Sequence, residues 1–256
     1  MLELRGVSKK FSAIKVVNDI SFTVAHGEVL GYLGPNGAGK TTTIRMLAGL
    51  LVPSKGEILF NGENIRSDIY AYKKRIGYVP EQSEIYPHLS AYDYLVMVGR
   101  LRGLPEKPLK RKVVEFLKIF DLEEEMDAPI SSYSKGMRQK VLITAAILHD
   151  PDVLLLDEPM SGLDVMTSLV IRDLIRSLAR EDKVIVYSSH VLEVTEKVCS
   201  KVIILHKGSI VANDSVDHLR QLMKLPSLSE IFNQLVVHAD TSVTAGRIVK
   251  TMKGEG

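Results

Sequence analysis

The sequence lacks tryptophan and has one cysteine, Cys199. A single thiol excludes an intramolecular disulfide, so a hydrophobic core must stabilise the fold, and the cytosol is the natural compartment. We expect Cys199 itself to be a small buried hydrophobic residue.

Long apolar runs are also absent. No stretch of about 20 apolar residues occurs, so no segment is expected to span a bilayer. The first residues do not show the basic-then-apolar pattern of a signal peptide either. A function at a membrane would therefore require docking on another protein.

The chain has little net charge, because 33 Lys and Arg residues face 31 Asp and Glu residues and leave +2. Nucleic-acid binding through bulk electrostatics is disfavoured, so we expect no nucleic-acid partner; only a local basic patch would provide another route. The length of 256 residues, 45% of them hydrophobic, suffices for one large domain or a domain plus a subdomain.

Short apolar strands alternate with amphipathic helices along most of the chain. Runs rich in Val, Ile and Leu predict buried strands, followed by a helix from Lys40 to about Leu50 and several later helices. The strands are expected at 29–34, 55–65, 75–80 and 153–157 and in the segments KVIVYSS and KVIILH. This alternation predicts an α/β fold with a parallel sheet covered by helices on both faces.

The alternation is interrupted from about residue 86 to 150, where apolar residues recur at helical spacing. We interpret this block as a helical subdomain inserted into a domain of residues 1–213. Residues 214–256 are predicted to form a helical extension, in which Ser227 and Glu230 have capping-box spacing.

A glycine-rich segment follows the first buried strand and precedes the first helix, in the pattern G-x-x-x-x-G-K-[ST]. Its residues are Gly34, Pro35, Asn36, Gly37, Ala38, Gly39, Lys40 and Thr41, and Thr42 follows. Glycines let backbone N–H groups curl around phosphate oxygens, and the helix N-terminus adds a positive dipole. The segment predicts a nucleoside triphosphate site in which Lys40 reaches the β- and γ-phosphates and Thr41 binds Mg²⁺.

Two adjacent carboxylates, Asp157 and Glu158, end the strand VLLLD. Ligands bind at the carboxyl edge of an open parallel sheet, so both side chains are expected beside the phosphates. Asp157 is placed to hold Mg²⁺ through water, and Glu158 could act as general base on the attacking water. His190 follows another strand and is expected at the same edge.

Ser134 begins a strong amphipathic helix that ends near His149. Its position is typical of a helix N-cap, where free N–H groups can also hold an anion. Spacing alone favours simple capping.

The ordered set of motifs resembles the nucleotide-binding subunit of an ABC transporter over about residues 1–212. GPNGAGKTT, from Gly34, resembles the Walker A loop, and VLLLDEP resembles the Walker B strand with its catalytic glutamate. SGLD, ending at Asp164, resembles the D-loop, and SSH, ending at His190, resembles the switch histidine. YSKGM, which contains Ser134 and Gly136, resembles the signature LSGGQ, and Phe11 falls at the A-loop position, where an aromatic ring stacks on adenine.

The resemblance implies a P-loop NTPase fold of RecA type. Its mostly parallel sheet would carry an N-terminal antiparallel β portion and an inserted helical subdomain. The implied catalytic residues are Glu158, His190 and Lys40. The implied nucleotide site adds Phe11, residues 34–42, Ser134, Gly136 and Asp164.

Two positions depart from the family pattern. In the signature, Lys135 replaces the first glycine and Met137 the glutamine, and we expect Lys135 to point to solvent. In YVPEQSEIYPHLS, Glu81 occupies the slot of the Q-loop glutamine and Gln82 follows, so either side chain could contact the metal. Both departures, and LSEIF near the end, resemble members that serve exporters.

The resemblance further implies an Mg²⁺-dependent ATPase that dimerises head to tail, with itself or a related subunit. Lys40, Thr41 and Asp157 of one subunit would face Ser134 and Gly136 of the other across ATP. An integral-membrane subunit would dock in the groove beside residues 81–88, at the cytoplasmic face of the cell membrane. The alternative is a soluble ABC-type ATPase, although such proteins usually carry two cassettes in one chain. A GTPase is disfavoured because no N-K-x-D segment occurs.

Overall fold

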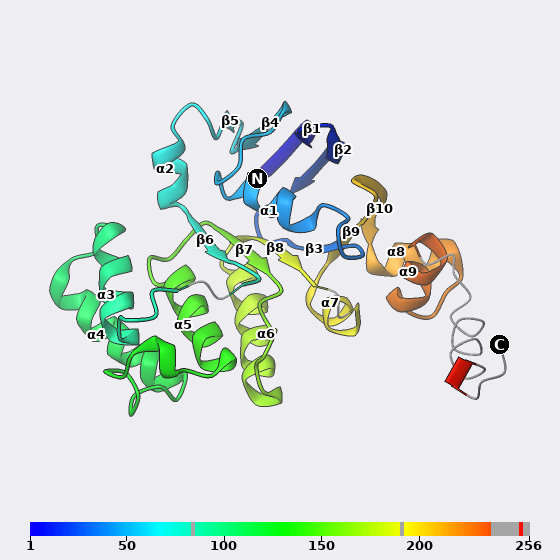
Figure 1. The fold of residues 1–256 in the computed structure, drawn as a ribbon. Helices are drawn as coiled ribbons and strands as arrows, with labels where there is room; N and C mark the ends of the chain where they lie inside the picture. Colours follow the sequence, from blue (N-terminus) through cyan, green and yellow to red (C-terminus); the bar gives the residue numbers. More distant parts are fainter. Residues whose placement is uncertain (83–84, 190–191, 237–250, 253–256) are drawn as a thin grey trace.

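The computed structural model describes residues 1–82, 85–189, 192–236 and 251–252. Within these ranges two sheets are stacked, and helices lie on the side of the larger sheet that faces away from the smaller one (Figure 1). The smaller sheet has the order β2-β1-β4-β5 and is antiparallel. It is built from β1 (Leu2–Phe11), β2 (Ile14–Val24), β4 (Lys55–Phe60) and β5 (Glu63–Asn64). The N-terminal antiparallel β portion is therefore confirmed.

The larger sheet has the order β10-β9-β3-β8-β7-β6 in the described part of the chain, and its strands pair in parallel except for β10. Its strands are β3 (Val29–Leu33), β6 (Ile76–Val79), β7 (Val153–Asp157), β8 (Val184–Ser188), β9 (Lys201–His206) and β10 (Ser209–Ser215). This arrangement confirms the predicted α/β class with a mostly parallel sheet. Strand β10 was not predicted, and it extends beyond residue 213, where the helical extension was expected to begin.

The central strands are buried on both faces, and their side chains alternate between two cores. Leu154 and Leu156 of β7 pack in the core beneath the helices, whereas Val153 and Leu155 pack in the core between the two sheets. A period of two therefore explains why these strands read as continuous apolar runs.

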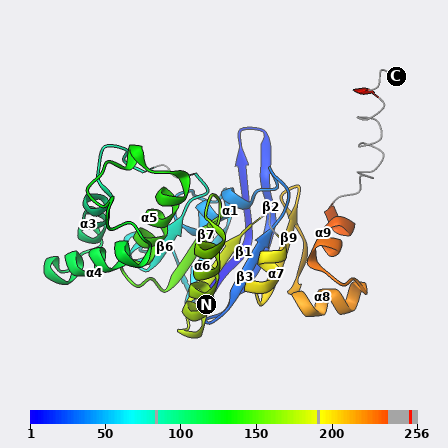
Figure 2. The ribbon, with the colours of Figure 1, turned by 90° about the horizontal axis from the view of Figure 1, so that it is seen from below.

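Nine α-helices lie in the described ranges. They are α1 (Lys40–Leu47), α2 (Ile69–Lys74), α3 (Ala91–Leu101), α4 (Glu106–Ile119), α5 (Lys135–Ile147), α6 (Val165–Arg180), α7 (Leu192–Val198), α8 (Val216–Met223) and α9 (Leu228–Val236). Figures 1 and 2 show α3, α4 and α5 gathered at one end of the molecule and α8 and α9 at the other. The first group is the predicted helical block. Among the described residues, none of the helices has both the length and the apolar character of a membrane span.

Helix α1 is shorter than predicted. It ends at Leu47, and Gly49 follows with a φ of 65°, which favours glycine. The N–H groups of Gly49 and Leu50 donate to the carbonyls of Met46 and Arg45, a hydrogen-bond pattern that closes a helix end. The predicted cap of the last helix is confirmed, because Ser227 Oγ accepts from the Glu230 N–H at 3.3 Å.

Candidate functional site

The glycine-rich segment 34–39 links the end of β3 to the start of α1 in a tight loop. A Cβ at Gly34 would lie 2.5 Å from the carbonyl oxygen of Leu205, and one at Gly39 would lie 2.8 Å from the carbonyl oxygen of Val16. Gly39 also has a φ of 105°, which side chains rarely tolerate. Glycine is therefore required here by close packing as well as by the turn.

Lys40 begins α1 and is only 9% exposed. Its ammonium donates to the carbonyls of Gly34 and Pro35 at 2.7 and 3.1 Å. Burial lowers the pKa of Lys40, and the negative charges of Glu158, Asp157 and Glu81 oppose that shift. The lysine is thus held inside its own loop, where phosphate oxygens could replace the two carbonyls.

A polar cavity of about 310 Å³ unites the loop with the two carboxylates. Its lining residues are Val16, Asn36, Gly37, Gly39, Lys40, Thr41, Thr42, Glu81, Asp157 and Glu158. Half of the site residues predicted from the sequence therefore line one cavity at the carboxyl edge of the sheet.

Asp157 is the last residue of β7 and is 1% exposed. Ser188, its neighbour on β8, donates a hydrogen bond from Oγ to Oδ1, while Oδ2 is buried with no hydrogen-bond partner among the described residues. Burial raises the pKa of this carboxyl group, and the nearby hydroxyl groups of Ser188 and Thr41 oppose that shift. A buried carboxylate oxygen without a donor suits a bound cation or its water.

The donor set fits Mg²⁺ that is held largely by phosphate oxygens. No group of three His, Cys, Asp or Glu side chains in the described ranges could hold a metal ion by itself. Mg²⁺ usually takes one or two protein ligands and completes its shell with water and phosphates. Thr41, whose hydroxyl donates to Glu81 Oε2 at 3.4 Å, and Asp157 would provide that small number of ligands.

Glu158 has a φ of 51°, which bends the chain sharply just after β7. Its N–H donates to the carbonyl oxygen and the Oγ of Ser188 at 3.2 and 3.3 Å, and Ser189 Oγ lies 3.5 Å from Oε2. The end of β8 thus supports both carboxylates. Ser188 and Ser189 were not predicted as site residues, although their place after the apolar run of β8 could have marked them.

Glu81 and Gln82, the two candidates for the Q-loop position, line different cavities in the structure. Glu81 lines the phosphate-loop cavity, whereas Gln82 lines a neighbouring cavity of about 460 Å³ together with Phe11 and Thr42. Phe11 is 46% exposed at the end of β1, with the ammonium of Lys9 5.1 Å from its ring centre. Thr42 lines both cavities, so Phe11 lies beside the phosphate site rather than in it.

The signature and D-loop residues do not line the phosphate-loop cavity of their own chain. Ser134 caps α5, as predicted, by accepting a hydrogen bond from the Met137 N–H at 3.2 Å. Asp164 caps α6 by accepting from the N–H and the hydroxyl of Thr167 at 2.8 and 2.6 Å, and the Thr167 hydroxyl contributes most to lowering its pKa.

Two further predictions concern Lys135 and His190. Lys135 is exposed, but its ammonium does not extend freely into solvent as expected, because it donates to Ser161 Oγ at 2.7 Å. His190 lies outside the described residues, so its predicted role stays a prediction.

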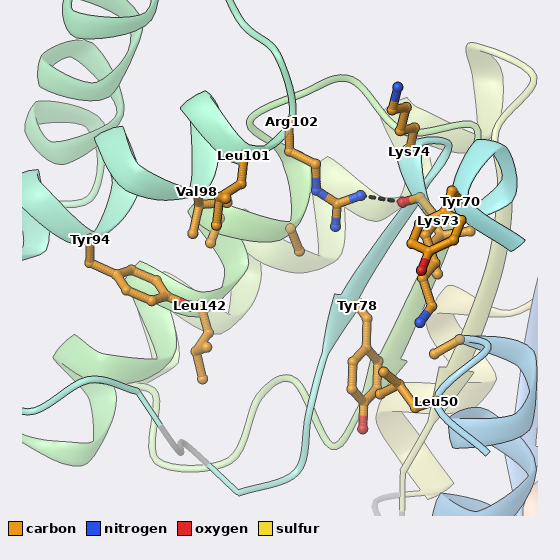
Figure 3. Close-up of a pocket in the computed structure, with 14 residues that line it drawn as sticks. Leu50, Tyr70, Lys73, Lys74, Tyr78, Tyr94, Val98, Leu101, Arg102 and Leu142 are labelled. Carbon is orange, nitrogen blue, oxygen red and sulfur yellow. Dashed lines mark hydrogen bonds between the residues drawn. The ribbon is translucent and has the colours of Figure 1, made fainter.

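A larger cavity of about 480 Å³ lies between the sheet and the helical block (Figure 3). It is lined by residues from α2, β6, α3 and α5, including the aromatic rings of Tyr70, Tyr78 and Tyr94. No described residue between 81 and 88 lines this cavity, so the groove predicted beside that segment stays a prediction.

Comparison with known proteins agrees with this geometry. The sequence profile of the family described as "ABC transporter" matches residues 17–161. The ABC transporter ATP-binding protein NatA of Bacillus subtilis (strain 168) is 38% identical over 93% of this chain and 98% of its own. The Nod factor export ATP-binding protein I of Ralstonia nicotianae is 35% identical over 83% of this chain and 66% of its own.

Solved structures extend the similarity to three dimensions. An ATP-binding subunit of an ABC transporter superposes with a TM-score of 0.86 and 32% identity, over 92% of this chain and 99% of that one. The dimeric cassette MJ0796, bound to ADP and Pi, gives 0.78 at 23% identity over 84% and 98%, which supports the fold alone.

The fold and the site together define a P-loop ATPase of the ATP-binding cassette class. The chain belongs to the ABC transporter family, as one of its ATP-binding subunits.

Proposed function

We propose that this chain hydrolyses Mg-ATP to drive an ABC exporter through a separate membrane subunit. The observation that carries the proposal is the single cavity that holds Lys40, Thr41, Asp157 and Glu158. It joins a phosphate cradle, a candidate cation site and a candidate general base, which phosphoryl transfer to water requires.

In this proposal the loop N–H groups and Lys40 bind the β- and γ-phosphates, and Phe11 stacks on adenine beside the loop. Thr41 and Asp157 hold Mg²⁺, with Glu81 rather than Gln82 beside them, because Glu81 lines the same cavity. When bound, Mg²⁺ would neutralise charge on the phosphate oxygens.

Glu158 accepts a proton from the attacking water as the water oxygen bonds to the γ-phosphorus, while the bond from that phosphorus to the bridging oxygen breaks and ADP leaves. The left-handed backbone at this residue and the hydrogen bonds from its N–H to Ser188 fix where the carboxylate begins. His190 is proposed to contact the γ-phosphate or to orient Glu158.

The active form in this proposal is a head-to-tail dimer. Ser134, Gly136 and Asp164 lie outside the cavity of their own chain, so a second copy or a related subunit would bring its signature residues to the nucleotide. The MJ0796 cassette, whose solved structure is a dimer, supports this assembly by analogy. ATP then forms part of the interface, and its hydrolysis opens the dimer.

The membrane subunit is proposed to dock in the cavity between α2, β6, α3 and α5 (Figure 3). Lys73, Lys74 and Arg102 line this cavity, and no acidic residue in the described ranges does. An amphipathic helix with an acidic residue would complement such a surface. This docking would hold the chain at the cytoplasmic face of the membrane.

Export is favoured over import by the names of relatives, including the Nod factor export protein. The alternative function is a soluble ABC-type ATPase that acts on another macromolecule. It would use the same nucleotide site without a membrane subunit.

The replacement Glu158→Gln tests the catalytic assignment and the dimer together. We expect retained ATP binding, turnover lowered by about 100-fold or more because the general base is lost, and an ATP-dependent dimer. Steady-state ATPase rates and size-exclusion chromatography with ATP measure both effects. Wild-type turnover in this variant would contradict the role of Glu158, and a monomer in ATP would contradict the dimer.

A further inference from the structure

Lys135 makes a contact that neither the sequence nor the proposed nucleotide site accounts for. It is the first residue of α5, and its ammonium donates to Ser161 Oγ at 2.7 Å. The methylene groups of the same side chain cover Gly162, where a Cβ would lie 2.9 Å from Cδ and 3.0 Å from Cγ of Lys135. The lysine therefore bridges the signature segment and the D-loop segment within one chain.

Two other contacts join the same segments. A Cβ at Gly136 would lie 2.7 Å from the carbonyl oxygen of Gly162, so the two backbones touch. One turn further along α5, Gln139 is 1% exposed and donates from Nε2 to the carbonyl of Pro159 at 3.0 Å. The first turns of α5 therefore contact residues 159–162 through hydrogen bonds and close packing.

Residues 159–162 follow Glu158 directly. The N–H of Ser161 donates to the carbonyl oxygen of Glu158 at 3.1 Å, which closes a turn on that residue. A continuous path of two hydrogen bonds therefore runs from the ammonium of Lys135 through Ser161 to the backbone of Glu158.

We propose that Lys135 is a positioning residue that links the signature segment to Glu158 of its own subunit. This inference rests on the proposed dimer, in which the signature segment contacts the nucleotide of the partner. Through Lys135, the nucleotide bound by the partner would then influence the position of Glu158, the general base for the nucleotide bound by this chain. A glycine at this place has no side chain to make the link.

The link is exposed in the single chain, where water competes for both groups. A partner subunit that covers it would remove that water and strengthen the interaction between ammonium and hydroxyl. The effect of Lys135 is therefore expected in turnover by the dimer rather than in folding.

The test compares ATPase kinetics of the full chain and its variants. Lys135→Ala and Ser161→Ala should each lower kcat roughly threefold to tenfold, the range expected from one hydrogen bond to a charged group. The KM for ATP should stay within about twofold, and the double variant should lose no more than either single one. Lys135→Arg, which keeps a charged donor, should recover most of the rate.

The matched control is Lys107→Ala, which removes the same charge from the exposed surface of α4. A Lys135→Ala kcat equal to that of this control would overturn the inference. A raised KM for ATP in Lys135→Ala, together with wild-type kinetics in Ser161→Ala, would also overturn the inference, because Lys135 would then contact ATP directly.

Failure of this inference is separable from failure of the proposed function. The dimer is measured independently by adding Lys135→Ala to the Glu158→Gln chain and repeating the chromatography with ATP. A normal dimer together with an unchanged Lys135→Ala kcat rejects only the positioning role. Absence of the dimer in Glu158→Gln rejects the assembly on which both proposals rest.

Discussion

At the scale of single residues, Asp157 combines burial with an unpaired oxygen. Folding places this carboxylate at the end of β7, with Oδ1 accepting from Ser188 and Oδ2 left without a donor among the described residues. Burying such a charge costs free energy. The site therefore carries a local instability that a cation could relieve.

Asp157→Asn should stabilise the chain without nucleotide while abolishing ATP turnover. Burial raises the pKa of Asp157 in the folded chain, so its negative charge destabilises the folded state in full at neutral pH. This cost disappears as the pH falls toward 3.8, the ordinary pKa of an aspartate. At neutral pH we expect a rise in Tm of about 2–4 °C, equal to about 1 kcal/mol, which fades on acidification. Thermal denaturation across pH measures it.

The control for this prediction is Asp127→Asn, which neutralises an exposed carboxylate and should leave Tm nearly unchanged. A Tm for Asp157→Asn at or below that of the wild-type chain at neutral pH would contradict the stated cost of burying Asp157.

At the scale of elements, α5 connects the sheet to the signature segment. Its N-terminus carries Ser134, and its C-terminal half packs directly on β6. The two elements approach closely at Gly77, where a Cβ would lie 2.2 Å from the carbonyl oxygen of Ala146. Helix α5 and strand β6 are in backbone contact there. The position of the signature segment therefore depends on the absence of a side chain at Gly77.

Gly77→Ala should force α5 away from β6. We expect a loss of about 1–3 kcal/mol from overpacking, because the neighbouring backbone has no rotamer that relieves the clash. Urea denaturation measures the loss. Gly99→Ala between α3 and α4 is the comparison, since its added methyl group meets the end of the Leu109 side chain, which can rotate. A Gly77→Ala chain as stable as Gly99→Ala would contradict the argument.

At the scale of the whole molecule, the sheet and the helical block enclose the largest of the cavities described above (Figure 3). Tyr70 and Leu101 at its edge are 80% and 77% exposed. Arg102 donates a hydrogen bond to the carbonyl of Lys73 across it, and burial lowers the pKa of this arginine. An exposed apolar surface with half-buried positive charge favours a protein partner.

Arg102→Glu should reverse the charge of this cavity and weaken capture of the membrane subunit. The measurement is a tagged pull-down from gently solubilised membranes with proteins identified by mass spectrometry. The wild-type chain should recover a polytopic membrane protein in near-stoichiometric amount, and Arg102→Glu should recover at least about tenfold less, as for a lost charge pair.

Arg111→Glu on the exposed surface of α4 is the matched control and should recover the partner normally. Equal recovery by Arg102→Glu would exclude the cavity as the docking site. Recovery of ribosomes or DNA-bound complexes by the wild-type chain would favour the soluble ATPase instead.

Local patterns predicted the elements that have strong sequence signals. The strand before Gly34, the helix after Gly39 and the cap at Ser134 follow from turn chemistry and apolar periodicity, which act over a few residues. Strand β10 was missed because its sequence SIVANDS has little apolar character. Its pairing with β9 across the turn at Lys207 and Gly208 stabilises it instead.

The sequence by itself determined the class of protein, because phosphate loops and carboxylate pairs are short motifs whose chemistry depends on spacing along the chain. Only the tertiary structure decided that Glu81 lines the site while Gln82 lines the next cavity, and that Ser188 supports Asp157. Only the tertiary structure joined Lys135 to Ser161. These choices depend on the directions of side chains brought together from distant segments, and spacing along one chain does not encode those directions.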